Sequence, residues 1–245
     1  MSDPVFLCDR LDGLAIGDTA TLAGDEGRHA VVVRRIRVGE RVVLTDGRGH
    51  GIAGTVTAVA NTSLQLTVDN LRHAPEPAVR YVVAQALAKG ERAELAVEML
   101  TEVGVDEILP WSASRSIVRW SADRATRGLA RWRSAAREAT KQSRRLRVPL
   151  IGEPVSTTAL AKRTAQAELA LVLHEEATEP LSAVALPPAG SVLIIVGPEG
   201  GIAPDELDAF VAAGACAVSI SDGVLRTSTA GAVAVALLRA CGIRP

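Results

Sequence analysis

Aromatic side chains are scarce in this sequence of 245 residues, where they make up 2% of the chain. RNA-binding modules that stack unpaired bases on a sheet surface depend on exposed aromatic rings, so this class of domain is disfavoured. If RNA is a ligand, arginine side chains, backbone amides and shape must carry most of its recognition.

Cysteine is scarce as well, with Cys8, Cys216 and Cys241 alone. These three form neither a CxxC pair nor an even disulfide framework, which favours a reducing compartment. The four histidines are scattered, so we expect no metal site. The N-terminus lacks a signal-peptide pattern, and the apolar stretch within Ala230–Leu238 is too short to span a bilayer. The sequence therefore predicts a cytoplasmic protein that does not enter a membrane.

Basic residues are distributed unevenly. The formal net charge is −1, yet the segment 115–147 contains eleven arginines and lysines against two acids. Most of this segment reads as one helix, in which an apolar face can pack on a sheet and the other faces are basic. A solvated helix surface is the common explanation, but the nearly single sign of the charges favours phosphate binding. A smaller basic patch contains Arg28, His29, Arg34, Arg35 and Arg37.

Residues 1 to 73 have the pattern of a small β-domain. Segments of alternating β-branched and polar residues are separated by turn signals such as Asp46-Gly47. Closely spaced short strands are typical of a barrel or sandwich. Pro75-Glu76-Pro77 then interrupts the pattern, and we place the domain boundary between residues 73 and 74. The expected elements are strands at 41–45, 51–59 and 63–68 and a helix at 25–35.

Residues 74 to 245 alternate between strands and helices. Such alternation indicates an α/β domain, with a parallel sheet covered by helices on both faces. Ligands of these sheets bind beyond the carboxyl ends of the strands, so we expect a site just after Leu173, Val196 and Ile220. The expected strands are 81–88, 106–110, 169–173, 191–196 and 215–220, and the expected helices include 91–103 and 122–143.

The segment after Val196 is the most distinctive. Gly197-Pro198-Glu199-Gly200-Gly201 has three glycines in five residues, which allows a tight turn and a close approach of the backbone to a ligand. The common phosphate-loop patterns do not match, and carboxylates in the following Pro204-Asp205-Glu206 would repel a phosphate. The loop therefore suits a ligand with an adenine or cationic end. A purely structural turn is the alternative interpretation.

A second distinctive segment, 223–230, joins a strand to a strongly apolar helix. Thr227 or Ser228 is the expected N-cap of this helix. Arg226 is either an ordinary surface arginine or a cation directed into the site.

These segments together resemble a known family. Gly197–Gly201 with Glu206, followed by the run 224–230, is similar to the two cofactor-loop motifs of the RsmE family. Its members are SPOUT-class methyltransferases that make N3-methyluridine in small-subunit ribosomal RNA. The runs 29–34, 102–110 and 137–149 match further motifs in order, so the resemblance covers nearly the whole chain. The family often has glutamate where this chain has Ser228, which weakens any acidic role there.

The resemblance implies a PUA-like β-barrel that binds RNA, an α/β SPOUT domain with a trefoil knot, and a homodimer. It also implies S-adenosylmethionine as cofactor and 16S ribosomal RNA, within the assembled small subunit, as partner. The reaction would be methylation of N3 of a specific uridine. The residues expected to bind the cofactor are Leu173, His174, Gly197, Pro198, Glu199, Gly200, Gly201, Ile220, Leu225, Thr227 and Ala230.

Arg226 is the expected catalytic residue, because a cation near O2 or O4 would stabilise the uracil anion. Two other functions remain open: methylation of a ribose 2′-hydroxyl by a relative of the same fold, and non-catalytic assembly of ribosomes. A nucleotide-dependent oxidoreductase is disfavoured, since a dinucleotide-binding fingerprint is missing. The residues expected to contact RNA are His29, Arg34, Arg35, Lys89, Arg115, Arg137, Gln142, Arg144 and Arg145.

Overall fold

A computed structural model describes residues 3–242. The chain divides into two compact units, which are described separately: unit 1 comprises residues up to Glu76 and 140–148, and unit 2 comprises 77–139 and the residues from 149 onward. The division at Glu76 lies close to the predicted boundary between 73 and 74. Nothing in the sequence pattern assigned 140–148 to the first unit.

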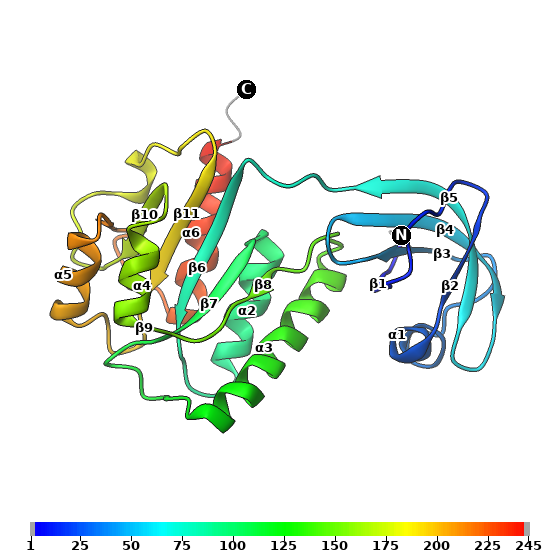
Figure 1. The fold of residues 1–245 in the computed structure, drawn as a ribbon, viewed down its shortest axis with the longest axis horizontal. Helices are drawn as coiled ribbons and strands as arrows, with labels where there is room; N and C mark the ends of the chain where they lie inside the picture. Colours follow the sequence, from blue (N-terminus) through cyan, green and yellow to red (C-terminus); the bar gives the residue numbers. More distant parts are fainter. Residues whose placement is uncertain (1–2, 243–245) are drawn as a thin grey trace. The chain divides into compact units, whose positions relative to one another are not determined.

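Unit 1 is built on one mixed, curled sheet in the strand order β1-β3-β4-β5-β2, seen on the right of Figure 1. Strand β1 pairs parallel with β3, and the other pairs are antiparallel. The three predicted strands are confirmed, whereas β1 and β2 were missed because short strands carry little periodic signal. The strands are β1 (Val5–Leu7), β2 (Thr19–Leu22), β3 (Arg41–Thr45), β4 (His50–Val59) and β5 (Leu64–His73).

The helix predicted at 25–35 is shorter and less regular than expected. Helix α1 (Gly24–Arg28) leads directly into a π-helical turn, η1 (His29–Val33). The Arg34 backbone N–H donates to the His29 carbonyl over 2.9 Å, an i to i−5 bond that widens the turn. Arg35 then takes a left-handed backbone with φ of 57°, which ends the helical path.

Residues 140–148 join unit 1 through contacts that are distant in the sequence. The Thr45 hydroxyl donates to the Leu146 carbonyl over 3.0 Å, and the Val148 N–H donates to the Gly47 carbonyl over 2.8 Å. Leu146 also packs against buried side chains of the sheet. These contacts attach the segment to the β3–β4 turn.

Unit 2 contains a parallel sheet in the order β12-β10-β11-β6-β7-β8, with β9 paired to β7. This confirms the predicted α/β class. The strands are β6 (Val79–Ala86), β7 (Glu107–Ser112), β8 (Leu150–Ile151), β9 (Val155–Ser156), β10 (Leu169–Leu173), β11 (Gly190–Val196) and β12 (Cys216–Val218). The helices are α2 (Arg92–Val103), α3 (Ala122–Gln142), α4 (Thr157–Thr164), the short η2 (Leu181–Ala183), α5 (Pro204–Ala212) and α6 (Thr227–Gly242).

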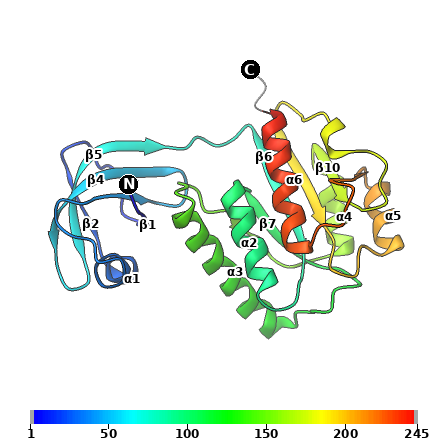
Figure 2. The ribbon, with the colours of Figure 1, turned by 180° about the vertical axis from the view of Figure 1, so that it is seen from behind.

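Helices cover both faces of this sheet. Figure 2 shows α2 and α6 in front of the strands, and α4 and α5 lie on the opposite face. Helix α2 ends at Gly104, whose φ of 88° is a left-handed C-cap. The predicted apolar face of α3 is confirmed, since Leu129, Trp132, Ala136 and Ala139 are all buried.

Parallel pairing brings the carboxyl ends of the strands to one edge of the sheet, so the segments that follow β10, β11 and β12 lie together. No helix within residues 3–242 is long and apolar enough to cross a membrane. The knot implied by the resemblance stays a prediction.

Candidate active site

Three loops of unit 2 meet at the carboxyl edge of the sheet and enclose a pocket of about 270 Å³. A smaller lobe of about 70 Å³ shares several of its walls, among them Leu173, Glu175 and Leu225. The loops follow β10, β11 and β12, which are the three positions that the sequence indicated. The pocket lies where parallel α/β sheets ordinarily bind ligands.

Most of the predicted cofactor-binding residues line this pocket. His174 and Ile220 border the smaller lobe, and the larger lobe is bordered by Leu173, Gly197, Pro198, Glu199, Gly201, Leu225, Thr227 and Ala230. Gly200 is the exception. Its carbonyl accepts a hydrogen bond of 3.2 Å from the Arg115 guanidinium, so it connects two loops and does not line either lobe.

The glycine loop needs its glycines for conformation and for space. Gly201 has φ of +72°, and its N–H donates to the Pro198 carbonyl over 2.9 Å to close the turn. A Cβ on Gly197 would lie 2.7 Å from Cγ1 of Ile202. The glycines thus have a structural role in the tight turn, and this turn forms part of the pocket wall.

Thr227 connects the loop Gly197–Gly201 with the loop that precedes α6. Its hydroxyl donates to the Gly197 carbonyl over 2.6 Å, and it accepts from Nε2 of the buried Gln85 over 3.1 Å. Gln85 also donates to the Thr227 carbonyl over 3.2 Å. The predicted N-cap, Thr227 or Ser228, is wrong in both alternatives, because α6 begins at Thr227 and both residues lie inside it. The Thr227 hydroxyl bonds another loop instead. Gln85 was missed, because a lone glutamine in an apolar strand gives no signal of its partner.

Glu206 holds the base of the glycine loop. Its buried carboxylate accepts from the Ser114 N–H at 2.9 Å, the Ser114 hydroxyl at 3.0 Å, the Thr157 hydroxyl at 2.7 Å and the Ala203 N–H at 3.3 Å. These donors come from three separate segments of the chain. Glu206 is thus a structural carboxylate beside the pocket and does not line it.

The charged side chains at the pocket are of both signs. Glu175 and Glu199 line it, and the Glu199 carboxylate lies 3.8 Å from the Arg92 guanidinium. Arg226 lines the larger lobe with an exposed side chain. An arginine at the rim can reach a second molecule that enters the pocket mouth. Within residues 3–242 no cluster of side chains is arranged to hold a metal.

The residues predicted to contact RNA fall into both units. Lys89, Arg115 and Arg137 are exposed in unit 2. The remaining six lie in unit 1: His29, Arg34, Arg35, Gln142, Arg144 and Arg145. The structure therefore brings the C-terminal part of the basic run into the same unit as the smaller basic patch, which the sequence alone did not indicate.

Two arginines of these segments have unusual backbones. Arg35 and Arg144 each have φ of 57°, and they are the only non-glycine residues with positive φ in the described part of the chain. A left-handed backbone costs a non-glycine residue roughly 1–2 kcal/mol. Both residues end a helical turn: the next N–H bonds back into the turn, from Ile36 to the Ala30 carbonyl and from Arg145 to the Thr140 carbonyl, each over 3.0 Å, as at a left-handed C-cap.

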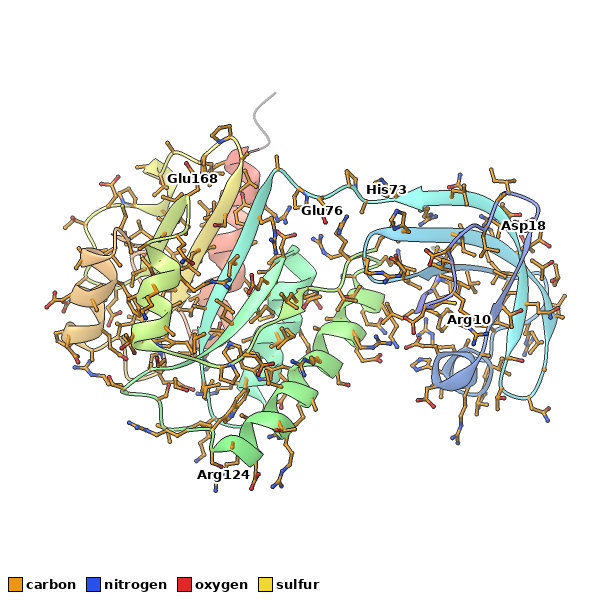
Figure 3. All side chains as sticks on the ribbon, in the orientation of Figure 1. Arg10, Asp18, His73, Glu76, Arg124 and Glu168 are labelled. Carbon is orange, nitrogen blue, oxygen red and sulfur yellow. The ribbon has the colours of Figure 1, made fainter. Side chains whose placement is uncertain are left out.

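Parts of the basic run serve the fold. Lys141 is buried, and its Nζ lies 2.9 Å from the Glu26 carboxylate. The Arg147 guanidinium donates to the Ala74 carbonyl at 2.9 and 3.1 Å. By contrast, Arg124, labelled in Figure 3, is exposed at the start of α3. The run is therefore a mixture of structural and surface charges.

Known proteins resemble both units of this chain. The model of an RNA methyltransferase domain matches residues 75–239, and that of an RNA methyltransferase PUA domain matches residues 22–69. Ribosomal RNA small subunit methyltransferase E of Mycobacterium bovis is 48% identical over 225 residues, which cover 89% of this chain and 85% of the relative. The chain belongs to the RsmE family.

Solved structures agree with this membership in the RsmE family. A ribosomal RNA small subunit methyltransferase E from Neisseria gonorrhoeae, bound to S-adenosyl methionine, is 26% identical with a TM-score of 0.84. A methyltransferase from Legionella pneumophila in complex with the same cofactor is 25% identical with a TM-score of 0.85. Each match covers 98% of both chains. The predicted PUA-like and SPOUT-type α/β parts are thereby confirmed.

Proposed function

We propose that this protein uses S-adenosylmethionine to methylate N3 of a specific uridine in the 16S RNA of the small ribosomal subunit. Membership in the RsmE family carries the proposal, together with the pocket that the three loops form at the carboxyl edge of the unit 2 sheet. The bound cofactor in two structural relatives supports the same assignment.

The residues of the pocket suit this cofactor. Leu173, Val196 and Leu225 offer an apolar wall to an adenine ring, and the backbone of the glycine loop offers polar groups at its edge. Glu175 and Glu199 offer carboxylates to the cationic end of the molecule. When bound, S-adenosylmethionine supplies a methyl group that its positively charged sulfur already activates.

The protein must therefore mainly align the uracil with the pocket and favour loss of its N3 proton. Arg226 is exposed at the pocket, where its guanidinium can stabilise the negative charge that develops on O2 or O4. N3 lies on the Watson–Crick edge, so the uridine must be unpaired or extruded before it reacts.

The RNA backbone would lie on the exposed basic residues. Arg34, Arg35 and Arg144 in unit 1 and Arg115 and Arg137 in unit 2 are exposed. The same proposal has three further parts: the assembled small subunit is the substrate, the protein is a homodimer in solution, and the RNA lies across both subunits of the dimer. Sedimentation of the purified protein tests the dimer, and a monomer at micromolar concentration would contradict it.

The decisive experiment is transfer of labelled methyl from S-adenosylmethionine to unmodified small ribosomal subunits, followed by nucleoside analysis. We expect the label in N3-methyluridine. Label in a 2′-O-methyl nucleoside would retain the fold and overturn the target. Absence of both transfer and saturable cofactor binding would favour the non-catalytic assembly factor.

A further inference from the structure

A second pocket lies in unit 1, and its lining residues have been assigned no function so far. Its volume is about 540 Å³, larger than either lobe of the cofactor pocket. The start of β4, the end of β5 and the loop 11–14 form its walls, and all of these belong to unit 1. Figure 3 labels His73 at the end of β5.

Two histidines form one wall of this barrel pocket. His50 and His73 are direct partners in the β4–β5 register, so their side chains share one face of the hairpin. Their ring centroids lie 4.9 Å apart with an interplanar angle of 38°. The next pair on the same face is Ile52 with Leu71, and Leu71 is 53% exposed. The pocket thus combines two neighbouring rings with an aliphatic wall that is open to solvent.

Asp46 fixes the orientation of one ring. Its carboxylate lies 3.3 Å from Nδ1 of His50 and also accepts from the backbone N–H groups of Arg48 at 2.7 Å and His50 at 3.0 Å. Burial alone would raise the pKa of Asp46, but these hydrogen bonds lower it, so the carboxylate is ionised and accepts from His50. Nδ1 of His50 is therefore the donor, and Nε2 is left for a ligand.

The phenylalanine, tyrosine and tryptophan rings of the protein are not available for stacking. Within residues 3–242, Phe6, Tyr81, Trp111, Trp132 and Phe210 are buried. Trp120 is half-buried, and its ring lies edge-on to Trp132 with centroids 5.6 Å apart. The side chain of His50 is 66% exposed, so the histidine pair presents the accessible ring surface beside a cavity.

Flat heterocycles stack on histidine rings, and unpaired RNA bases are recognised in this way. The edge of a base also carries amino, imino and carbonyl groups that can hydrogen-bond to Nε2 of His50. The aliphatic side chains of Leu11, Leu14 and Leu71 also line the pocket and suit the apolar face of a base. A phosphate group would need a cationic pocket, whereas Arg72, the one arginine of this lining, is accompanied there by the carboxylate of Asp12 and by aliphatic side chains.

We propose that the barrel pocket of unit 1 receives one unpaired nucleobase of the RNA substrate, stacked against His50 and His73. This inference rests on the proposed function, since it presumes an RNA substrate. It adds a base-reading site to a surface otherwise expected to hold the RNA backbone. The base in this pocket is distinct from the uridine that is methylated at the cofactor pocket.

The test compares the affinities of two single-stranded probes by fluorescence anisotropy: an oligouridine and an abasic ribose-phosphate oligomer of the same length. For the double variant His50→Ala/His73→Ala we expect a loss of about tenfold for the oligouridine, within the range for one stacked base. Affinity for the abasic oligomer should stay at the wild-type value. Thr57→Ala, an exposed change on the same strand β4, is the matched control and should change neither affinity.

Two further measurements keep the proposal falsifiable. His73→Phe retains a ring and should keep the preference for base-bearing RNA, whereas His73→Ala should not. Thermal melting of each variant shows whether unit 1 remains folded. An oligomer containing 4-thiouridine should photo-crosslink to peptides within residues 50–73 of the wild-type protein. If the double variant melts early, this crosslinking experiment takes the place of the binding comparison with that variant.

Equal losses for both probes would overturn the proposal, since the histidines would then act on the backbone. No loss for either probe and no crosslink would overturn it in favour of a protein segment or a second copy of this chain. Methyl transfer to small ribosomal subunits is measured in parallel. If the wild type transfers methyl but the two RNA probes do not behave as expected, only the base-binding role of the barrel pocket is refuted. If the wild type transfers no methyl, the proposed function is refuted.

Discussion

Single residues at the cofactor pocket divide into those that face a ligand and those that hold the loops. Thr227 and Gln85 hold the loops together, because their hydrogen bonds connect β6, the glycine loop and the start of α6. Arg226, the neighbour of Thr227, has an exposed side chain at the pocket. Thr227 therefore stabilises the pocket, whereas the side chain of Arg226 is exposed at it, where the proposed function has it act on the uracil.

The role of Arg226 can be tested by its removal. We expect Arg226→Ala to lower the turnover of methyl transfer by about 10²-fold, the effect of losing one preorganised electrostatic donor. Affinity for S-adenosylmethionine should change little, since the guanidinium would act on the uracil. Initial rates on small subunits and equilibrium binding of the cofactor separate the two effects. Lys162→Ala, exposed on α4 and outside the basic run, is the control, and unchanged turnover in Arg226→Ala would refute the assignment.

At the scale of elements, the glycine loop is held by the first turn of α5. Glu206 accepts four hydrogen bonds from three segments while buried, so its loss leaves several polar groups without their acceptor. The two carboxylates expected to repel a phosphate thus have different roles. Glu206 is internal, and Asp205 is exposed.

We expect Glu206→Ala to lower the free energy of unfolding by about 3 kcal/mol or more, since buried donors are left unsatisfied. Asp205→Ala should change it by less than about 1 kcal/mol. Denaturant titration of the two variants measures the difference. Similar stabilities for both would mean that water replaces the carboxylate at this place.

The turn between β3 and β4 depends on Asp46 in a similar way. Hydrogen bonds from Arg48 and His50 lower its pKa below the ordinary value of about 3.9, in spite of its burial. At a pH above the pKa that Asp46 has in the unfolded chain, its lowered pKa in the folded state stabilises the fold. This contribution is lost as the pH falls through the pKa of the folded state.

Asp46→Asn should therefore be less stable than the wild type near pH 7. The difference should shrink as the pH falls below about 4 and through the lower folded pKa of Asp46. Thermal melting of both proteins across this range measures it. If the difference in stability between Asp46→Asn and the wild type stays constant down to the lowest pH, the variant is destabilised by its altered hydrogen-bond geometry and not by the loss of the negative charge.

At the scale of the whole molecule, a net charge of −1 conceals separate basic surfaces. Lys141 is buried against Glu26, so it does not contribute to these surfaces. Exposed arginines in both units do, and in unit 1 two of them, Arg35 and Arg144, have left-handed backbones. These left-handed backbones end helical turns and belong to the fold, so it is the exposure of the two side chains that makes them accessible to RNA.

Binding of small-subunit RNA should weaken steeply with salt, because each neutralised phosphate releases counterions. The double variant Arg34→Ala/Arg144→Ala should reduce the slope of log affinity against log salt by about one for each phosphate that is no longer neutralised. Lys162→Ala, exposed on α4, is the control and should leave the slope unchanged. Binding that hardly responds to salt would refute the basic surfaces as the RNA site.

Periodicity, turn residues and glycine spacing by themselves determined much of this protein. They placed β3, β10, α2 and most of α3, the α/β class, and the three segments that form the cofactor pocket. These features are local: a strand, a helix cap or a tight turn depends on neighbours in the chain. The short strands β1 and β2 were missed because their pairing partners, and not their own pattern, make them strands.

Only the tertiary structure decided which distant residues meet. It assigned 140–148 to unit 1, turned Thr227 from a cap into a bond between loops, moved Gly200 out of the pocket lining, and buried Glu206 and Lys141 as structural charges. It also placed His50 beside His73. Each of these contacts joins residues that are not neighbours in the chain, and single-sequence patterns carry no information on such pairs.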